Sequence, residues 1–280
     1  PASKTTMAWT CTLPIRLELT DGEGLDSWLE ALAHRTRTGF GDLLVALGLP
    51  TASQQGAGRW ITQLTPEQLR SISDATETAP ERVGATTLDW YSGRALHIDP
   101  RKATTTRQFA WSQVRGSRFC PACLDENGGR WQLAWRLELS FACRIHRCLL
   151  VDTCPGCSQP QRIRPHVGYA VPQPGLCGNP ASGALGKSAP RCLADLREIE
   201  TLALPAHHPV IQAQTTINRL ISVEPEVFGL YRHWPEPANR ILADIRAIAT
   251  RALAYGDTCD IEKLIPEDLF ETYHAAMGNR

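Results

Sequence analysis

Apolar residues recur every three or four positions in the first part of the chain, which is the spacing of amphipathic helices. One set is Leu25, Trp28, Leu29, Leu32 and Ala33, and the next is Phe40, Leu43, Leu44 and Leu47. Thr65-Pro66-Glu67-Gln68 has the pattern of a capping box and predicts the start of a third helix. Pro80 predicts a short fourth. Such helix pairs are typical of helix-turn-helix modules and also of helices that simply pack together.

Helical spacing returns in the last third of the chain. Its first set is Val210, Gln214, Ile217, Leu220 and Ile221, and its second is Ile241, Leu242, Ile245, Ile248 and Ala252. Pro266 predicts a last helix carrying Leu269, Phe270 and Tyr273. We expect the Pro-flanked pair His207-His208 to be solvated. In the middle of the chain Trp131, Leu133, Trp135 and Leu137 alternate with polar residues, which predicts a strand or an amphipathic turn with the aromatic rings in a core.

Ten cysteines change this picture, because eight of them fall between residues 120 and 192. Four of the eight form two CxxC pairs, Cys120–Cys123 and Cys154–Cys157. A CxxC turn directs two thiolates at one centre, and a second pair of ligands completes a tetrahedron around Zn²⁺. Outside an oxidising compartment, such clustering favours metal binding over disulfides. Cys11 and Cys259 stand alone and are expected to be ordinary thiols.

The next cysteine follows each CxxC pair after the same gap of 19 residues. Cys143 and His146 complete a Cys₃His set with Cys120 and Cys123, whereas Cys177 and Cys192 complete a Cys₄ set with Cys154 and Cys157. Two alternatives stay open: Cys148 in place of His146 in the first set, and His166 as a rival ligand in the second. Both sets supply four protein ligands and leave no open position, so two structural zinc ions are predicted rather than a catalytic one.

Charge is uneven along a chain whose formal net charge is zero. Residues 101–164 carry 11 basic and 4 acidic side chains, which makes a basic island between mildly acidic flanks. Such an island attracts polyanions. The residues predicted to contact nucleic acid or another partner are eight of its ten arginines: Arg115, Arg118, Arg130, Arg136, Arg144, Arg147, Arg162 and Arg164.

These patterns together predict a mainly α fold with small zinc-stabilised modules. Residues 1–117 form a helical, helix-turn-helix-like part, residues 118–200 form a tandem zinc-finger or zinc-ribbon module, and residues 201–280 form a helical segment. No GxSxG, P-loop, GxGxxG or HExxH motif occurs, so we do not expect an enzyme. With no long apolar run and no signal-peptide pattern, we expect a cytoplasmic protein that does not engage a membrane.

The stretch Phe119-Cys120-Pro121-Ala122-Cys123-Leu124, together with Trp131 to Leu137 and the segment from Cys143 to Cys157, resembles the TniQ family. Gly22 to Leu29 is similar to the family's N-terminal helix, and Leu64 to Leu69 is similar to a later helical repeat. The resemblance covers roughly residues 13 to 160. By that resemblance, Cys120, Cys123, Cys143 and His146 are the first zinc set, and Cys154 and Cys157 are half of the second.

Resemblance to this family implies a bacterial accessory factor of DNA transposition. TniQ-like proteins, including the TnsD target selectors, have helix-turn-helix-like and zinc-finger modules. Some recognise an attachment site on double-stranded DNA, and others dimerise and bind a CRISPR effector ribonucleoprotein. They recruit an AAA+ ATPase and, through it, the transposase. The alternative function is a zinc-finger transcription regulator, which would bind DNA without such an ATPase partner.

Overall fold

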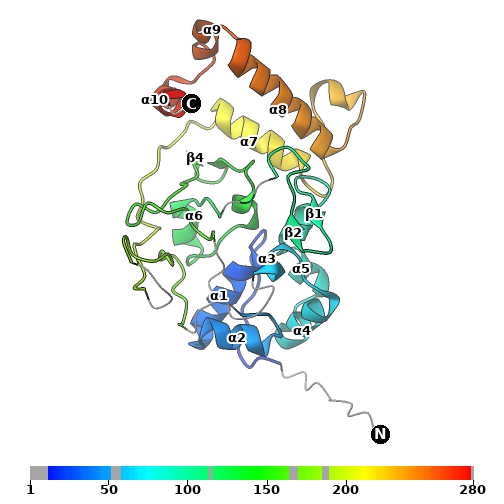
Figure 1. The fold of residues 1–280 in the computed structure, drawn as a ribbon, viewed down its shortest axis with the longest axis vertical. Coiled ribbons are helices and arrows are strands. Elements are labelled where there is room, and N and C mark those ends of the chain that lie inside the picture. The colour runs from blue at the N-terminus through cyan, green and yellow to red at the C-terminus, as the bar shows by residue number, and fades with distance from the viewer. Residues whose placement is uncertain are drawn as a thin grey trace.

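A computed structural model of the chain describes residues 12–51, 58–112, 114, 116–163, 170–184 and 189–278. The described residues are rich in helix and have few, short strands, in agreement with the predicted fold class. Figure 1 shows the N-terminal helices at one end of the molecule, the cysteine-rich segment in the middle and the C-terminal helices at the other end. Among the described helices, none is both long and apolar enough to cross a membrane.

Five helices form the N-terminal end, and the predicted apolar positions face its core. They are α1 (Leu25–Thr36), α2 (Phe40–Ala46), α3 (Arg59–Thr62), α4 (Pro66–Thr76) and α5 (Pro80–Gly84). Trp28, Phe40 and Trp60 are the largest side chains in this core, and each is almost fully buried. The capping box is confirmed, because the Thr65 and Gln68 side chains each accept a hydrogen bond from the other residue's backbone N–H.

Short elements make up the middle of the chain. They are the 3-10 helix η1 (Leu88–Tyr91), β1 (Ile98–Asp99), β2 (Thr104–Thr105), α6 (Pro121–Glu126), the 3-10 helix η2 (Leu133–Arg136), β3 (Ala142–Cys143) and β4 (Cys148–Leu149). β1 pairs with β2 and β3 with β4, each antiparallel. The alternating aromatic segment is thus a helical turn and not a strand. Its four apolar side chains, from Trp131 to Leu137, are all buried, as the core interpretation predicted.

The C-terminal end is helical again. It contains α7 (Pro209–Leu220), η3 (Gly229–Arg232), α8 (Ala238–Tyr255), α9 (Thr258–Glu262), η4 (Glu267–Leu269) and α10 (Phe270–Gly278). The predicted apolar face of α8 is buried only over its first turns. Ile241 and Leu242 are buried, but Ile248 is 69% exposed, because the second half of α8 extends away from the rest of the chain.

One apolar cluster joins all three parts of the chain. It contains Leu88, Leu133 and Ile241, with Leu220 and Ile221 at the end of α7. His208 differs from its expected solvated state: it is buried, accepts a hydrogen bond from the Val210 N–H at the start of α7, and contacts Asp268 through Nε2 at 3.1 Å. The C-terminal end of α7 is therefore fixed by packing, and its N-terminal end is fixed by the imidazole of His208, which caps it.

Candidate metal centres

The first cluster is built by one short helix and one hairpin. Cys120 is the N-cap residue of α6, and Cys123 lies in the first turn of that helix behind Pro121. Cys143 ends β3, and His146 lies in the turn that leads to β4. The β3–β4 pairing brings this turn back over α6, so residues more than twenty positions apart meet.

The spacing of the ligand atoms in this cluster fits a tetrahedral zinc ion. With Zn–S bonds near 2.3 Å and Zn–N bonds near 2.1 Å, tetrahedral geometry places neighbouring sulfurs about 3.8 Å apart and sulfur and nitrogen about 3.6 Å apart. The Sγ atoms of Cys123 and Cys143 are 3.6 Å apart. His146 Nδ1 lies 3.4, 3.2 and 3.7 Å from the sulfurs of Cys120, Cys123 and Cys143. These four residues could hold one zinc ion.

A carboxylate outside the cluster orients the imidazole. Nε2 of His146 lies 2.9 Å from Oε1 of Glu126, at the end of α6. With Nε2–H donating to Glu126, the lone pair of Nδ1 is directed at the three sulfurs, which is the tautomer a metal requires. Glu126 was not identified from the sequence, although its position three residues after Cys123 places it one helical turn along α6.

Cys148 lies beside the first cluster, with its Sγ 3.8 Å from Cys120 Sγ. The group whose ligand atoms all lie within 4.8 Å of one another nevertheless contains His146 and not Cys148. The geometry thus favours His146 as the fourth ligand. Cys148 is buried directly behind the site, paired with Cys143 across the β3–β4 ladder.

The second cluster gathers Cys154, Cys157, Cys177 and Cys192. The first two lie in and beside a tight turn, and the last two lie on irregular segments that pair antiparallel to each other. Cys177 N–H donates to Ala194 at 2.9 Å, and Cys192 N–H donates to Asn179 at 2.9 Å. This pairing explains how ligands separated by 14 residues meet at one centre.

Sulfur spacing in the second cluster also matches tetrahedral zinc. Both the Cys154–Cys192 and the Cys157–Cys177 Sγ distances are 3.8 Å. The Gln161 side chain donates to Cys177 Sγ at 3.3 Å, which helps to offset thiolate charge. Gly156 is required by space, because a Cβ there would lie 2.9 Å from both Cys192 Sγ and the Ala194 side chain.

Both clusters are suited to structural metal ions. Seven of the eight predicted ligands are cysteines. All seven are free thiols in the structure, and all but Cys192 are buried. Four protein ligands fill the coordination shell of Zn²⁺, and a bound ion would cross-link segments that have little regular structure of their own. His166, the rival ligand, and Cys11 lie outside the described residues.

Three of the predicted contact arginines are engaged inside the protein. Asp26 on α1 pairs with Arg136 and, at 2.5 Å, with Arg162; Arg162 also pairs with Glu30 at 2.5 Å. Arg130 pairs with the buried Glu23. These ion pairs connect α1 to the cysteine-rich segment. The three guanidinium groups are nearly inaccessible to solvent and are held by carboxylates of the same chain. We therefore do not assign Arg130, Arg136 and Arg162 to contact with a partner.

Burial and ion pairing oppose each other at these carboxylates. Burial alone would raise the pKa of Asp26, but the charges and hydrogen bonds of Arg136 and Arg162 lower it to about 2. Burial also acts on Glu30, and there it outweighs the neighbouring Arg162, so that the pKa of Glu30 is raised. Asp26 is therefore ionised near neutral pH, whereas burial works against the ionised form of Glu30.

The other predicted contact arginines are distributed as follows. Arg118 is half-buried; it pairs with Asp152 at 2.5 Å and donates to the backbone carbonyls of Glu138 and Ser140. Arg144 and Arg147 are exposed in the turn that carries His146, on either side of the 75%-exposed Ile145. Arg115 and Arg164 lie outside the described residues.

The fold and these centres define a mainly helical protein with two sites that could hold zinc. The family model of TniQ matches residues 14–150, a region that includes the N-terminal helices and the whole first cluster. This match supports membership in the TniQ family, as the motifs predicted. A search of the curated proteins gives no match. Family membership implies an accessory, transposition-associated function, and the TniQ family is non-catalytic.

Proposed function

We propose that this protein selects the target site in DNA transposition. It contacts double-stranded DNA or a CRISPR ribonucleoprotein, and it recruits an AAA+ ATPase and, through it, the transposase. The observation that carries the proposal is the combination of a TniQ match over residues 14–150 with a Cys₃His cluster of tetrahedral spacing inside that match. An accessory protein of this kind needs a rigid platform for several partners and no reacting groups.

In this proposal the two clusters bind two structural Zn²⁺ ions. The first ion is held by Cys120, Cys123, Cys143 and His146, and the second by Cys154, Cys157, Cys177 and Cys192. Each ion cross-links distant segments and so adds to the small apolar core that packs around the cysteines. The proposal is supported by ligand atoms that stand at zinc-like separations in both clusters.

The first zinc site also presents a contact surface. The turn after β3 holds His146 inward and exposes Arg144, Ile145 and Arg147. We assign this turn, together with the N-terminal helix pairs in their helix-turn-helix-like role, to contact with the target or the ATPase. Self-association into a homodimer is a further part of the proposal, which the resemblance suggests and sedimentation would test.

Metal content tests the zinc assignment. Wild-type protein should contain about two zinc ions per chain by elemental analysis, and Cys143→Ser and Cys177→Ser should each contain about one. Cys259→Ser is the matched control, because Cys259 is exposed and distant in sequence from both sets, and it should keep two. A metal-free wild type that is fully folded would contradict the assignment.

Insertion-site mapping tests the function. With the cognate ATPase and transposase, insertions should be directed to one site when the protein is present and become scattered or rare without it. If insertions are equally frequent and equally targeted without the protein, the proposal is wrong. Failure to recover the ATPase with the purified protein, combined with sequence-specific DNA binding, would favour a transcription regulator instead.

A further inference from the structure

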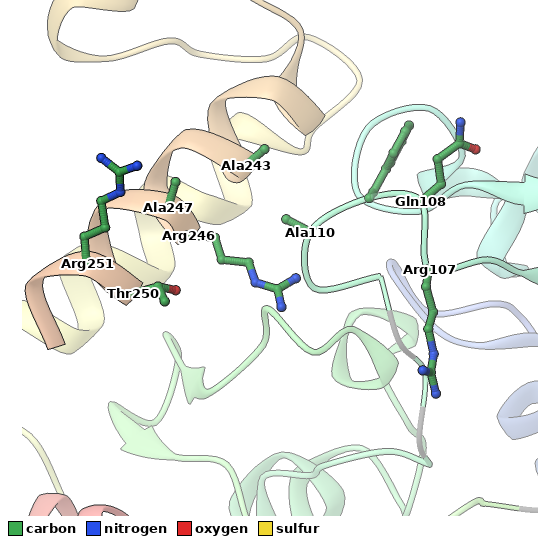
Figure 2. A pocket seen from close by; sticks show the side chains of 9 residues that line it. Arg107, Gln108, Ala110, Ala243, Arg246, Ala247, Thr250 and Arg251 are labelled. Carbon is green, nitrogen blue, oxygen red and sulfur yellow. The ribbon is translucent and has the colours of Figure 1, made fainter. Parts of the chain in front are cut away.

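A hollow of about 450 Å³ lies between α8 and the loop that follows β2, outside both metal centres. Figure 2 shows α8 on one side and the loop on the other. Its lining residues are Arg107, Gln108, Phe109 and Ala110 from the loop, and Ala243, Arg246, Ala247, Thr250 and Arg251 from α8. None of these nine residues belongs to a motif in the sequence, and three of them are arginines.

The charge of this hollow is uncompensated. Among the described residues that line it, none is acidic. Arg107, Arg246 and Arg251 are all exposed, and within the described part of the chain none of them has an ion pair or a side-chain hydrogen bond. This contrasts with Arg136 and Arg162, whose charges are neutralised by carboxylates inside the fold. Three unpaired arginines on the walls of one hollow favour an anionic ligand.

The arrangement of the arginines indicates an extended anion. Arg246 points into the gap between α8 and the loop, whereas Arg107 and Arg251 point in other directions from its two walls (Figure 2). Ala243 and Arg251 are eight positions apart in α8, or about 12 Å along the helix axis. The hollow is open, while sites for small molecules enclose most of their ligand. Several charges spaced along a chain fit this geometry better than one compact anion.

Nearby residues strengthen the positive charge. Residues 100–112 and 238–255 together contain six basic side chains and one acidic one, in a protein of zero net charge. The acidic one, Asp244, is turned to the Tyr231 hydroxyl, which donates to it at 2.9 Å. Beyond Arg246, α8 is exposed on all sides, so a long ligand can lie along it without displacing protein.

We propose that this hollow binds the phosphate backbone of double-stranded DNA, through Arg107, Arg246 and Arg251. The inference rests on the proposed function, which it deepens by moving a DNA contact from the central arginines to α8 and the loop after β2. Each guanidinium that neutralises a phosphate releases counterions, so the three together determine part of the salt dependence of binding.

Salt-dependent binding to a labelled mixed-sequence duplex tests the proposal. We expect Arg107→Gln/Arg246→Gln/Arg251→Gln to lower the slope of log affinity against log salt by about 2.7, at about 0.9 per phosphate contact. The ratio of the wild-type affinity to the affinity of this variant should then fall by about 40-fold between 50 and 200 mM salt. The corresponding triple Arg→Lys variant should keep most of the slope, because it keeps the charges.

The matched control is Arg219→Gln/Arg232→Gln/Lys263→Gln, which removes the same charge from exposed positions outside the hollow and outside the N-terminal helices. The inference fails, and the proposed function stands, if wild type binds duplex DNA and the Arg107/Arg246/Arg251→Gln variant binds with an unchanged slope. It also fails if this variant and the control variant lose slope equally. If wild type binds no duplex even at low salt, both the inference and direct DNA contact fail. Zinc content, measured in parallel, should be the same in all variants.

Discussion

Removing the carboxylate of Asp26 should destabilise the protein strongly, although Asp26 belongs to neither metal centre. Its side chain is 6% exposed and pairs with Arg136, which is 7% exposed, and with Arg162, which is 13% exposed. In Asp26→Ala, Arg162 retains Glu30, but Arg136 retains only the carbonyl of Arg162 at 3.2 Å. A buried guanidinium is then left without a counter-charge.

The expected cost can be worked out in two ways. A pKa lowered from 3.8 to about 2 means that the fold favours the ionised form of Asp26 by about 2 kcal/mol. Breaking a buried ion pair by removing one partner typically costs about 3–5 kcal/mol, because the remaining charge stays desolvated. At about 2–4 °C per kcal/mol for a chain of this size, the apparent melting temperature should fall by about 10 °C.

Thermal unfolding of zinc-saturated protein, followed by circular dichroism, measures this effect. Asp152→Ala is the matched control: it removes the same side chain from an ion pair with Arg118, but Asp152 is 69% exposed. Its cost should stay below about 1 kcal/mol. If Asp26→Ala melts within 2 °C of Asp152→Ala, the network contributes little and the reasoning is refuted.

The dependence on pH has a definite sign. The folded-state pKa of Asp26 lies below its ordinary value, so its contribution is fully present above about pH 4 and is lost as pH falls towards 2. The difference in melting temperature between wild type and Asp26→Asn should therefore be constant from pH 8 to pH 5. A difference that already declines over this range would assign the effect to another group.

Three further predictions concern the metal centres. Glu126→Ala should weaken zinc binding at the first site by about 10–100-fold in a chelator competition, because the imidazole loses its orienting partner, while the neighbouring Asp125→Ala should not. Cys148→Ser should keep two zinc ions per chain; loss of one would identify Cys148 as the ligand in place of His146. Gly156→Ala should impair the second site, since the added Cβ meets Cys192 Sγ at 2.9 Å, whereas Gly84→Ala, with open space around it, should retain full zinc content.

Local sequence patterns predicted the elements and most ligand atoms well. The capping box at Thr65, the helix start at Pro80 and the CxxC turns depend on residues within a few positions of one another, so their spacing carries the information. The apolar period of α7 was equally informative. The same period in α8 predicted a longer buried face than exists, because periodicity indicates which side of a helix is apolar and not whether anything covers it.

Contacts between distant segments could not be predicted in this way. No local signal identifies Asp26 as the partner of Arg136 and Arg162, which are more than a hundred residues away. Composition alone predicts a contact surface in the basic island between residues 101 and 164. It does not reveal that carboxylates on α1 neutralise some of these arginines. Likewise, Arg107 and Arg246 are unremarkable in sequence, and they become a candidate site only because the fold places α8 beside the loop after β2.

Two adjacent residues link the second metal centre to the N-terminal helices. Gln161 donates its side-chain amide to Cys177 Sγ, and Arg162 pairs with Asp26 and Glu30 on α1 while its guanidinium lies 4.6 Å from the Trp131 ring centre. A shift of the Cys177 segment on metal loss must therefore move the backbone that positions Arg162. In the zinc-bound protein that we propose, the second site would therefore support the packing of α1 as well as its own module. A partner that binds the N-terminal helices would then bind a surface whose rigidity depends on metal held elsewhere in the chain.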